Sequence, residues 1–275
     1  MDDNEPSGRA GPPPAARRPN RRRRPGPPGA GPHGSTLADA APEPTPRPRE
    51  LVATWAWAVG GIALATALAR VEPTGLLRGN LAGVAALVFL LLPDPRIRAA
   101  GGTWRESGLP WWGLRDGRTW RAWARGAAVG AGVGLVVLPA FGLALVAALR
   151  ALGQATVLAP RLPDGLAWAA ATQVLVVALP EELFYRGWMQ TAWARRGPGR
   201  RVLGATLGPG FLATQALFAA GHLVTLQPWR LATFFPGLLF GWLRARTGDV
   251  AAPVVLHALS NLFLVVLDAS LAAPR

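Results

Sequence analysis

Six side chains that could take part in a reaction lie within otherwise apolar stretches of this sequence. They are Glu181, Glu182, Arg186, His222, His257 and Asn261. A charge near the centre of a membrane costs about 2.5–3.5 kcal/mol, so polar residues in such stretches are candidates for function. A carboxylate that loses solvation becomes a stronger base, and a neighbouring imidazole can hold the proton that the base removes. These residue types therefore suit activation of a water molecule for hydrolysis.

The acidic pair lies in the segment Pro180-Glu-Glu-Leu-Phe-Tyr-Arg-Gly. Glu182 and Arg186 are four residues apart, so on a helix they share a face and can pair, which leaves Glu181 free. One carboxylate would then be structural and the other available for chemistry. The alternative is that a helix ends at Pro180 and the glutamates only mark its end. The apolar residues that continue to Trp193 favour the first interpretation.

The rise of a helix places the acid and the two histidines at comparable depths. Counted from the adjoining turns at about 1.5 Å per residue, Glu181 lies about 21 Å in, His222 about 20 Å and His257 about 14 Å. Asn261 follows His257 by one turn on the same face. Either histidine alone could be a core residue bonded to a backbone carbonyl, so it is the set that favours a site.

Hydrolysis of an amide also needs hydrogen-bond donors for the negative charge that develops on the carbonyl oxygen. The imidazole N–H of His257 and the side-chain amide of Asn261 fit that task in a site closed to bulk water. The sequence therefore offers both a base and a pair of oxyanion donors.

Other catalytic arrangements fit less well. The His-Glu-x-x-His string of metalloproteases is missing, although two histidines and a carboxylate could hold zinc in principle. Ser260 lacks the glycine-rich surroundings of a positioned serine nucleophile. Asp249 has the position of a helix N-cap and Asp268 lies near the far end of its stretch, which disfavours an aspartate pair. We expect a glutamate base assisted by histidine, without metal or cofactor, and zinc stays the open alternative.

The elements that must hold these residues are long apolar segments. Hydrophobic residues make up 51% of the 275 residues and charged residues 16%, which disfavours a soluble enzyme. Seven stretches have about the length that crosses a bilayer. They are 51–69, 76–93, 126–149, 166–194, 205–226, 231–243 and 250–267. We expect an all-α, polytopic bundle of about seven transmembrane helices, of which the fourth and sixth could be kinked or partly re-entrant.

Glycines at four-residue spacing occur in two of these stretches. One set is Gly126, Gly130 and Gly134, and the other is Gly237 and Gly241. Small residues at this spacing let membrane helices approach closely. No strand precedes Gly130, so we interpret the first set as a packing surface and not as part of a dinucleotide loop.

Arginine supplies all 29 basic residues, and the formal net charge is +14. With the N-terminus in the cytoplasm, 23 arginines fall on the cytoplasmic side, as the positive-inside rule requires. The six on the opposite side are Arg70, Arg78, Arg150, Arg161, Arg230 and Arg275. This distribution predicts an integral protein of the cytoplasmic (inner) membrane with a cytoplasmic N-terminus.

Residues 1–49 are rich in Pro, Gly, Ala and Arg and have too few apolar residues to form a core. We therefore expect a disordered cytoplasmic tail over 1–49 and a transmembrane helical domain over 50–275. The Arg21–Arg24 cluster suits anionic lipid headgroups. No aromatic residue interleaves the tail, which disfavours nucleic acid as its partner.

Three motifs resemble those of the CAAX protease and bacteriocin-processing (CPBP or Abi) family of intramembrane endopeptidases. They read Glu181-Glu-Leu-Phe-Tyr-Arg186, Phe218-Ala-Ala-Gly-His222 and His257-Ala-Leu-Ser-Asn261, within a motif-bearing core of about 166–267. The resemblance implies a metal-free glutamate protease in which Glu181 and His222 activate the water. It assigns His257 and Asn261 to the oxyanion, with Glu182 and Arg186 as supporting residues.

The sequence thus predicts an intramembrane endopeptidase that cleaves a membrane-associated protein or peptide, with a C-terminal anchor, a lipidated terminus or a sorting signal as candidate substrates. The alternative is a non-catalytic immunity factor or scaffold, in which Glu182, Arg186 and the histidines only join helices. The first two apolar stretches carry no motif, so we expect them to serve targeting, lipid contact or partner docking. The lack of cysteine excludes disulfides and thiol nucleophiles.

Overall fold

The structure is a computed structural model that describes residues 46–99, 103, 117–154 and 157–272. All of these residues belong to the unit Gly34–Arg275. The predicted disordered tail over 1–49 falls almost wholly outside the described residues, and it therefore stays a prediction.

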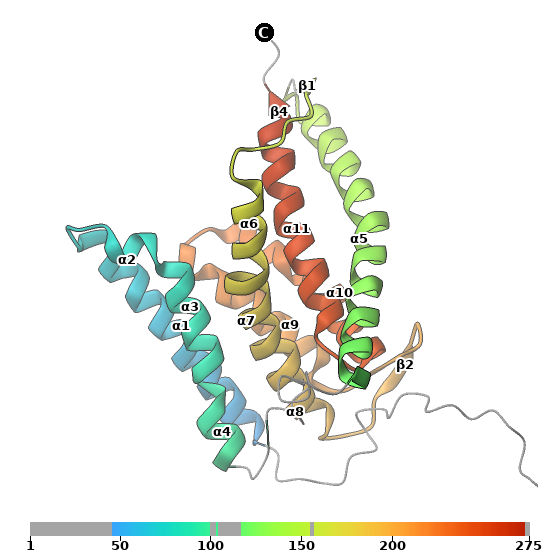
Figure 1. Cartoon of the computed structure of the whole chain (residues 1–275). Coiled ribbons are helices and arrows are strands. Elements are labelled where there is room, and N and C mark those ends of the chain that lie inside the picture. The colour runs from blue at the N-terminus through green and yellow to red at the C-terminus, as the bar shows by residue number, and fades with distance from the viewer. Residues whose placement is uncertain (1–45, 100–102, 104–116, 155–156, 273–275) are drawn as a thin grey trace, which may run out of the picture. The chain divides into compact units, whose positions relative to one another are not determined.

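Helices make up nearly all of the described chain, which confirms the predicted all-α class (Figure 1). The first part comprises α1 (Pro48–Val71), α2 (Leu76–Gly79), α3 (Leu81–Leu91), α4 (Pro93–Ala99) and α5 (Gly117–Ala151). One helical run then covers α6 (Leu166–Thr172), a π-helical segment (Gln173–Ala178), α7 (Leu179–Glu182), a second π-helical segment (Leu183–Gln190) and α8 (Thr191–Ala194). The last part comprises α9 (Gly210–Gly221), two 3₁₀ segments (His222–Thr225 and Pro228–Thr233), α10 (Phe234–Thr247) and α11 (Ala251–Ser270).

Two short antiparallel strand pairs connect some of these helices. Strand β1 (Val157–Leu158) pairs with β4 (Leu271–Ala272), and β2 (Arg200–Val202) pairs with β3 (Ala205–Leu207). The sequence analysis did not predict them, because strands of two or three residues are too short to show an alternating pattern.

Four helices in the described chain are long and apolar enough to cross a membrane. They are Pro48–Val71, Trp120–Ala151, Leu166–Ala194 and Ala251–Ser270. The other predicted stretches form shorter helices. In the second stretch the helix is interrupted at Asn80, between α2 and α3. In the fifth stretch the backbone changes from α to 3₁₀ geometry at His222. The fourth stretch, which the sequence allowed to be kinked or partly re-entrant, contains two π-helical segments.

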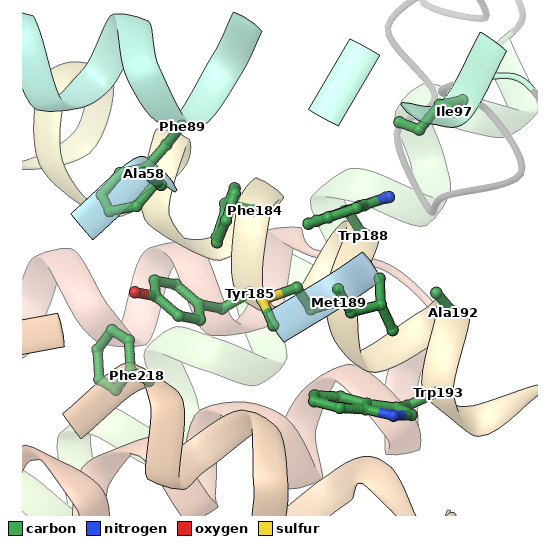
Figure 2. Packing of buried hydrophobic residues seen from close by; sticks show 11 residues of the cluster. Ala58, Phe89, Ile97, Phe184, Tyr185, Trp188, Met189, Ala192, Trp193 and Phe218 are labelled. Atoms are coloured by element: carbon green, nitrogen blue, oxygen red, sulfur yellow. The ribbon is translucent and has the colours of Figure 1, made fainter. Parts of the chain in front are cut away.

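The second π-helical segment forms the centre of the largest hydrophobic cluster. Every residue from Leu183 to Gln190 is buried, so neighbouring helices surround this part of the run on all sides. Figure 2 shows Phe184, Tyr185, Trp188 and Met189 packed against side chains from other elements. These contacts come from α1, α3, α4 and α9 through Ala58, Phe89, Ile97 and Phe218. Burial on every side fixes the rotation of this run, and with it the direction of its polar residues.

Helices α5 and α11 pack side by side through the first set of glycines (Figure 1). A Cβ atom at Gly130 would lie 2.3 Å from the carbonyl oxygen of Ala252, and one at Gly126 would lie 2.5 Å from the Asp249 carboxylate. A Cβ atom at Gly132 would meet nothing within 4 Å. The predicted close approach is therefore confirmed, and it sets the position of the helix that carries His257.

Candidate active site

A cavity of about 860 Å³ lies among the helices, and all four residues expected to do chemistry line it. Glu181 comes from α7, His222 from the 3₁₀ turn after α9, and His257 and Asn261 from α11. The three motifs, far apart in sequence, therefore meet at one cavity. Most of the other lining side chains are apolar, which suits an apolar segment of chain or a lipid chain as the occupant.

The two neighbouring glutamates have separate places. Glu181 lines the cavity, and within the described residues its Oε2 atom is buried without a hydrogen-bond partner. Glu182 is fully buried behind the cavity wall, and its Oε1 atom accepts hydrogen bonds from Arg186 Nη1 at 3.0 Å and from His257 Nδ1 at 2.8 Å. The predicted pairing of Glu182 with Arg186 is confirmed, and Glu181 is left facing the cavity.

Arg186 is a fully buried cation with several partners besides Glu182. Its Nη2 atom donates to Gln215 Oε1 at 2.8 Å and to the Gly237 carbonyl at 3.2 Å. Its guanidinium carbon lies 4.2 Å from the centre of the Phe218 ring. Hydrogen bonds from a planar guanidinium together with stacking on an aromatic face are what an arginine needs in order to remain charged without water.

The geometry around His222 identifies its tautomer. His222 Nδ1 lies 2.9 Å from the Phe218 carbonyl oxygen, and a carbonyl oxygen only accepts, so Nδ1 carries the proton. In the neutral ring Nε2 is then a free acceptor. Phe218 also packs edge-on against the His222 ring, with ring centres 4.7 Å apart. One phenylalanine thus supports both a histidine of the site and Arg186.

His257 is held from two directions. Its Nδ1 faces the Glu182 carboxylate, and its ring stacks on Phe240 with ring centres 5.0 Å apart and an angle of 17° between the planes. Since the carboxylate accepts, Nδ1 donates, so Nε2 is a donor only when the ring is an imidazolium.

Asn261 is one turn beyond His257 and lines the same cavity. Its Nδ2 atom donates to Gln173 Oε1 at 2.8 Å. Gln173 begins the first π-helical segment and also lines the cavity. Sequence reasoning missed Gln173 because, apart from Asn261 one turn after His257, it considered only charged residues and histidines in the apolar stretches.

Two further amides missed in the same way continue the buried polar network behind the cavity. Gln215 Nε2 donates to Gln190 Oε1 at 3.2 Å, and Gln190 Nε2 donates to the Gly241 carbonyl at 2.8 Å. A Cβ atom at Gly241 would lie 2.5 Å from Gln215 Nε2. The second glycine pair therefore does more than allow packing, since Gly237 and Gly241 offer their carbonyl oxygens to Arg186 and Gln190.

The N-terminal helices also line the cavity, beyond the targeting and docking roles expected for them. Val59, Ile62 and Thr66 of α1 line it, and so does Phe89 of α3. Trp55 of α1 donates from Nε1 to the Leu217 carbonyl at 3.0 Å, which ties α1 to α9. Segments without any motif thus form part of the wall around the candidate site.

The residues considered for other catalytic arrangements lie elsewhere. The Ser260 hydroxyl donates to the Leu256 carbonyl at 2.7 Å, so it is engaged within its own helix. Asp249 Oδ1 accepts from the Ala251 N–H at 2.8 Å at the start of α11. The N-cap residue is Val250, so the predicted N-cap position is wrong by one residue. Among the described residues no group of three or more His, Cys, Asp and Glu side chains could hold a metal ion.

Comparison with known proteins gives one match. Residues 163–263 match the family described as type II CAAX prenyl endopeptidase Rce1-like. No curated protein matches the chain, and no solved structure matches it. The match spans all three motifs and confirms the predicted family resemblance over this segment. It indicates a peptide-bond hydrolase, and together with the four apolar helices it indicates an integral membrane protein.

Proposed function

Because residues 163–263 match a family of CAAX endopeptidases, we propose that this protein is an intramembrane endopeptidase that uses a glutamate-activated water. The observation that carries the proposal is the cavity lined by Glu181, His222, His257 and Asn261. A carboxylate, two imidazoles and an amide from separate elements around one mostly apolar cavity are the groups that amide hydrolysis requires.

Glu181 is the proposed base. Its side chain lines the cavity, and its Oε2 atom has no hydrogen-bond partner among the described residues, so no structural bond to Oε2 competes when the carboxylate takes a proton from a water molecule in the cavity. His222 presents Nε2 as an acceptor because Nδ1 donates to Phe218. The water therefore has two acceptors, and the imidazole can carry the proton to the leaving amine.

His257 and Asn261 are the proposed donors to the oxyanion. Glu182 orients His257 through Nδ1, which leaves Nε2 for the substrate, and Nε2 donates when the ring carries both protons. Asn261 uses one Nδ2 hydrogen for Gln173, and the second hydrogen is available to the substrate. Loss of a single oxyanion donor typically costs a factor of about 10²–10³ in kcat.

The proposed substrate is a membrane-associated protein whose cleaved segment is apolar, since apolar side chains form most of the cavity wall. The proposed orientation has the N-terminus in the cytoplasm and the enzyme in the cytoplasmic membrane, as the arginine distribution favours. The Arg-rich tail is proposed to contact anionic lipid headgroups. No metal or cofactor takes part in the proposed reaction.

The test compares the termini of membrane proteins in strains that carry the wild type, Glu181→Gln or His222→Ala. Thr66→Val serves as the control, because Thr66 also lines the cavity and its hydroxyl bonds only within its own helix. We expect at least one protein terminus that forms with the wild type and Thr66→Val and is missing with the other two, at equal membrane levels of all four.

Two results would contradict the proposal. Normal termini in the Glu181→Gln strain would exclude the glutamate base. If the two variants instead accumulate less folded protein than the wild type, that result would favour the non-catalytic scaffold, in which these polar residues serve only to join helices.

A further inference from the structure

Gln173 is a polar residue on the cavity wall that neither the motifs nor the proposed reaction assign to a role. It is the first residue of the π-helical segment Gln173–Ala178, eight positions before Glu181. It lies in an apolar span of the membrane domain, where burying an uncharged amide costs free energy unless the amide is hydrogen-bonded. π-helical insertions of this kind are frequent at functional sites.

The partner of Gln173 is Asn261, the proposed oxyanion donor. Asn261 Nδ2 donates to Gln173 Oε1 at 2.8 Å, and the two residues are 88 positions apart in the chain. Both residues line the cavity. The contact therefore joins the first π-helical segment to α11 at the level of the proposed reaction.

In the structure this hydrogen bond points the nitrogen end of the Asn261 amide at Gln173, and Asn261 keeps that orientation while Gln173 presents Oε1 to it. An amide has a donor end and an acceptor end of nearly the same shape. With one Nδ2 hydrogen on Gln173 Oε1, the other hydrogen of the same nitrogen remains for an oxyanion. If the Asn261 amide turned over while Gln173 kept its orientation, Asn261 Oδ1 would take the place of Nδ2. Oδ1 would then face Gln173 Oε1, and the lone pairs of Oδ1 would repel the oxyanion.

We propose that Gln173 is a positioning residue that holds the Asn261 amide with its N–H groups directed for oxyanion stabilisation. The inference rests on the proposed function, because it gives Gln173 a part in the same reaction. Gln173 acts through Asn261, and so its contribution depends on the presence of the Asn261 side chain.

The experiment uses Gln173→Met, which keeps the length of the side chain and removes the acceptor. Purified full-length wild type, Gln173→Met, Asn261→Ala and the double variant are compared in lipid nanodiscs. The probe is a quenched fluorescent peptide that spans the terminus found to depend on Glu181. Thr54→Val is the control, since Thr54 lies in α1 away from the cavity-lining residues and its hydroxyl donates to the Glu50 carbonyl of its own helix.

We expect Gln173→Met to lower kcat about fivefold to tenfold, the loss that one hydrogen bond of ordinary strength predicts, with KM changed less than twofold. In the Asn261→Ala background the same substitution should change kcat less than twofold, because no amide remains to be oriented. Thr54→Val should leave kcat unchanged.

Other results would overturn the inference in ways that separate it from the proposed function. An equal loss of kcat in both backgrounds, or unchanged kcat in Gln173→Met, would exclude the positioning role while Glu181 stays essential. If no terminus depends on Glu181, the proposed function fails, and the inference fails with it.

Discussion

Gly130 is the position at which a single added methyl group should most disturb the helix pair that carries the site. Alanine at this position would place Cβ 2.3 Å from the carbonyl oxygen of Ala252 and 3.1 Å from its Cα. Ordinary contacts between carbon and carbonyl oxygen are about 3.3–3.6 Å, so the two backbones would have to separate by roughly 1 Å. The obstacle is backbone, which cannot turn aside as a side chain can.

The expected cost follows from the close packing of protein interiors. Overpacking typically costs about 1–3 kcal/mol, and a backbone obstacle places Gly130→Ala at the upper end of that range. The gain in helix propensity on replacing glycine with alanine returns at most about 1 kcal/mol. The net loss is therefore about 2 kcal/mol, or roughly 4–8 °C in Tm for a chain of this size.

Gly132→Ala is the matched control, since its Cβ would meet nothing within 4 Å on the same helix. Both variants are purified in nanodiscs, and thermal unfolding and proteolytic activity are measured. Gly130→Ala should lower Tm and reduce activity because α11 moves and carries His257 with it. Gly132→Ala should match the wild type in both measurements. Equal Tm values for the two variants, or a lower value for Gly132→Ala, would refute the packing argument.

Two further predictions concern charged groups near the ends of the helices. Within the described residues, the buried Arg244 has a single hydrogen bond, from Nη2 to Thr191 Oγ1 at 3.1 Å, and burial lowers its pKa to about 10 although the Asp249 charge opposes that shift. Arg244→Met should therefore change Tm little, whereas Arg186→Met, which strands the buried Glu182 carboxylate, should cost about 3–5 kcal/mol. Thermal unfolding of both variants checks this, and the reverse order would contradict it. Desolvation raises the pKa of Asp249 above its ordinary value, so the folded state binds its proton more tightly than the unfolded state and the ionised carboxylate opposes folding at neutral pH. Asp249→Asn keeps the hydrogen-bond acceptor for the start of α11 and should raise Tm slightly at pH 7. This difference in Tm should vanish as the pH falls toward the ordinary aspartate pKa. A difference that grows as the pH falls would contradict the raised pKa of Asp249.

The helical fold could be predicted because membrane spans depend on length and apolarity, which are properties of single segments. Hydrophobic length located the four long apolar helices, whereas α4 lies almost wholly between two predicted stretches. The π-helical segments could not be predicted, since the insertion of one residue per turn is decided by packing on every side. The same holds for the strand pairs β1–β4 and β2–β3, which depend on where helix ends meet.

The candidate site was predictable as far as the spacing of charged and imidazole side chains extends. The pairing of Glu182 with Arg186 follows from four residues on one helix face, and the structure contains it at 3.0 Å. The link from Glu182 to His257 spans 75 positions, and no local pattern reports it. The same is true of Gln173, whose partner is fixed only when the first π-helical segment and α11 are packed together.

The buried network also explains why the cation behind the cavity is an arginine. Arg186 bonds to three acceptors on three elements, namely the Glu182 carboxylate, the Gln215 amide and the Gly237 carbonyl, while its face lies 4.2 Å from the centre of the Phe218 ring. A lysine ammonium is a compact point charge without a planar face. It could not bond to these three acceptors in the same directions and also stack on the Phe218 ring. Because Glu182 also orients His257, the placement of this proposed oxyanion donor depends on a guanidinium that does not line the cavity. The rigidity of the proposed site thus originates in the packing of α9 and α10 against the motif-bearing helix.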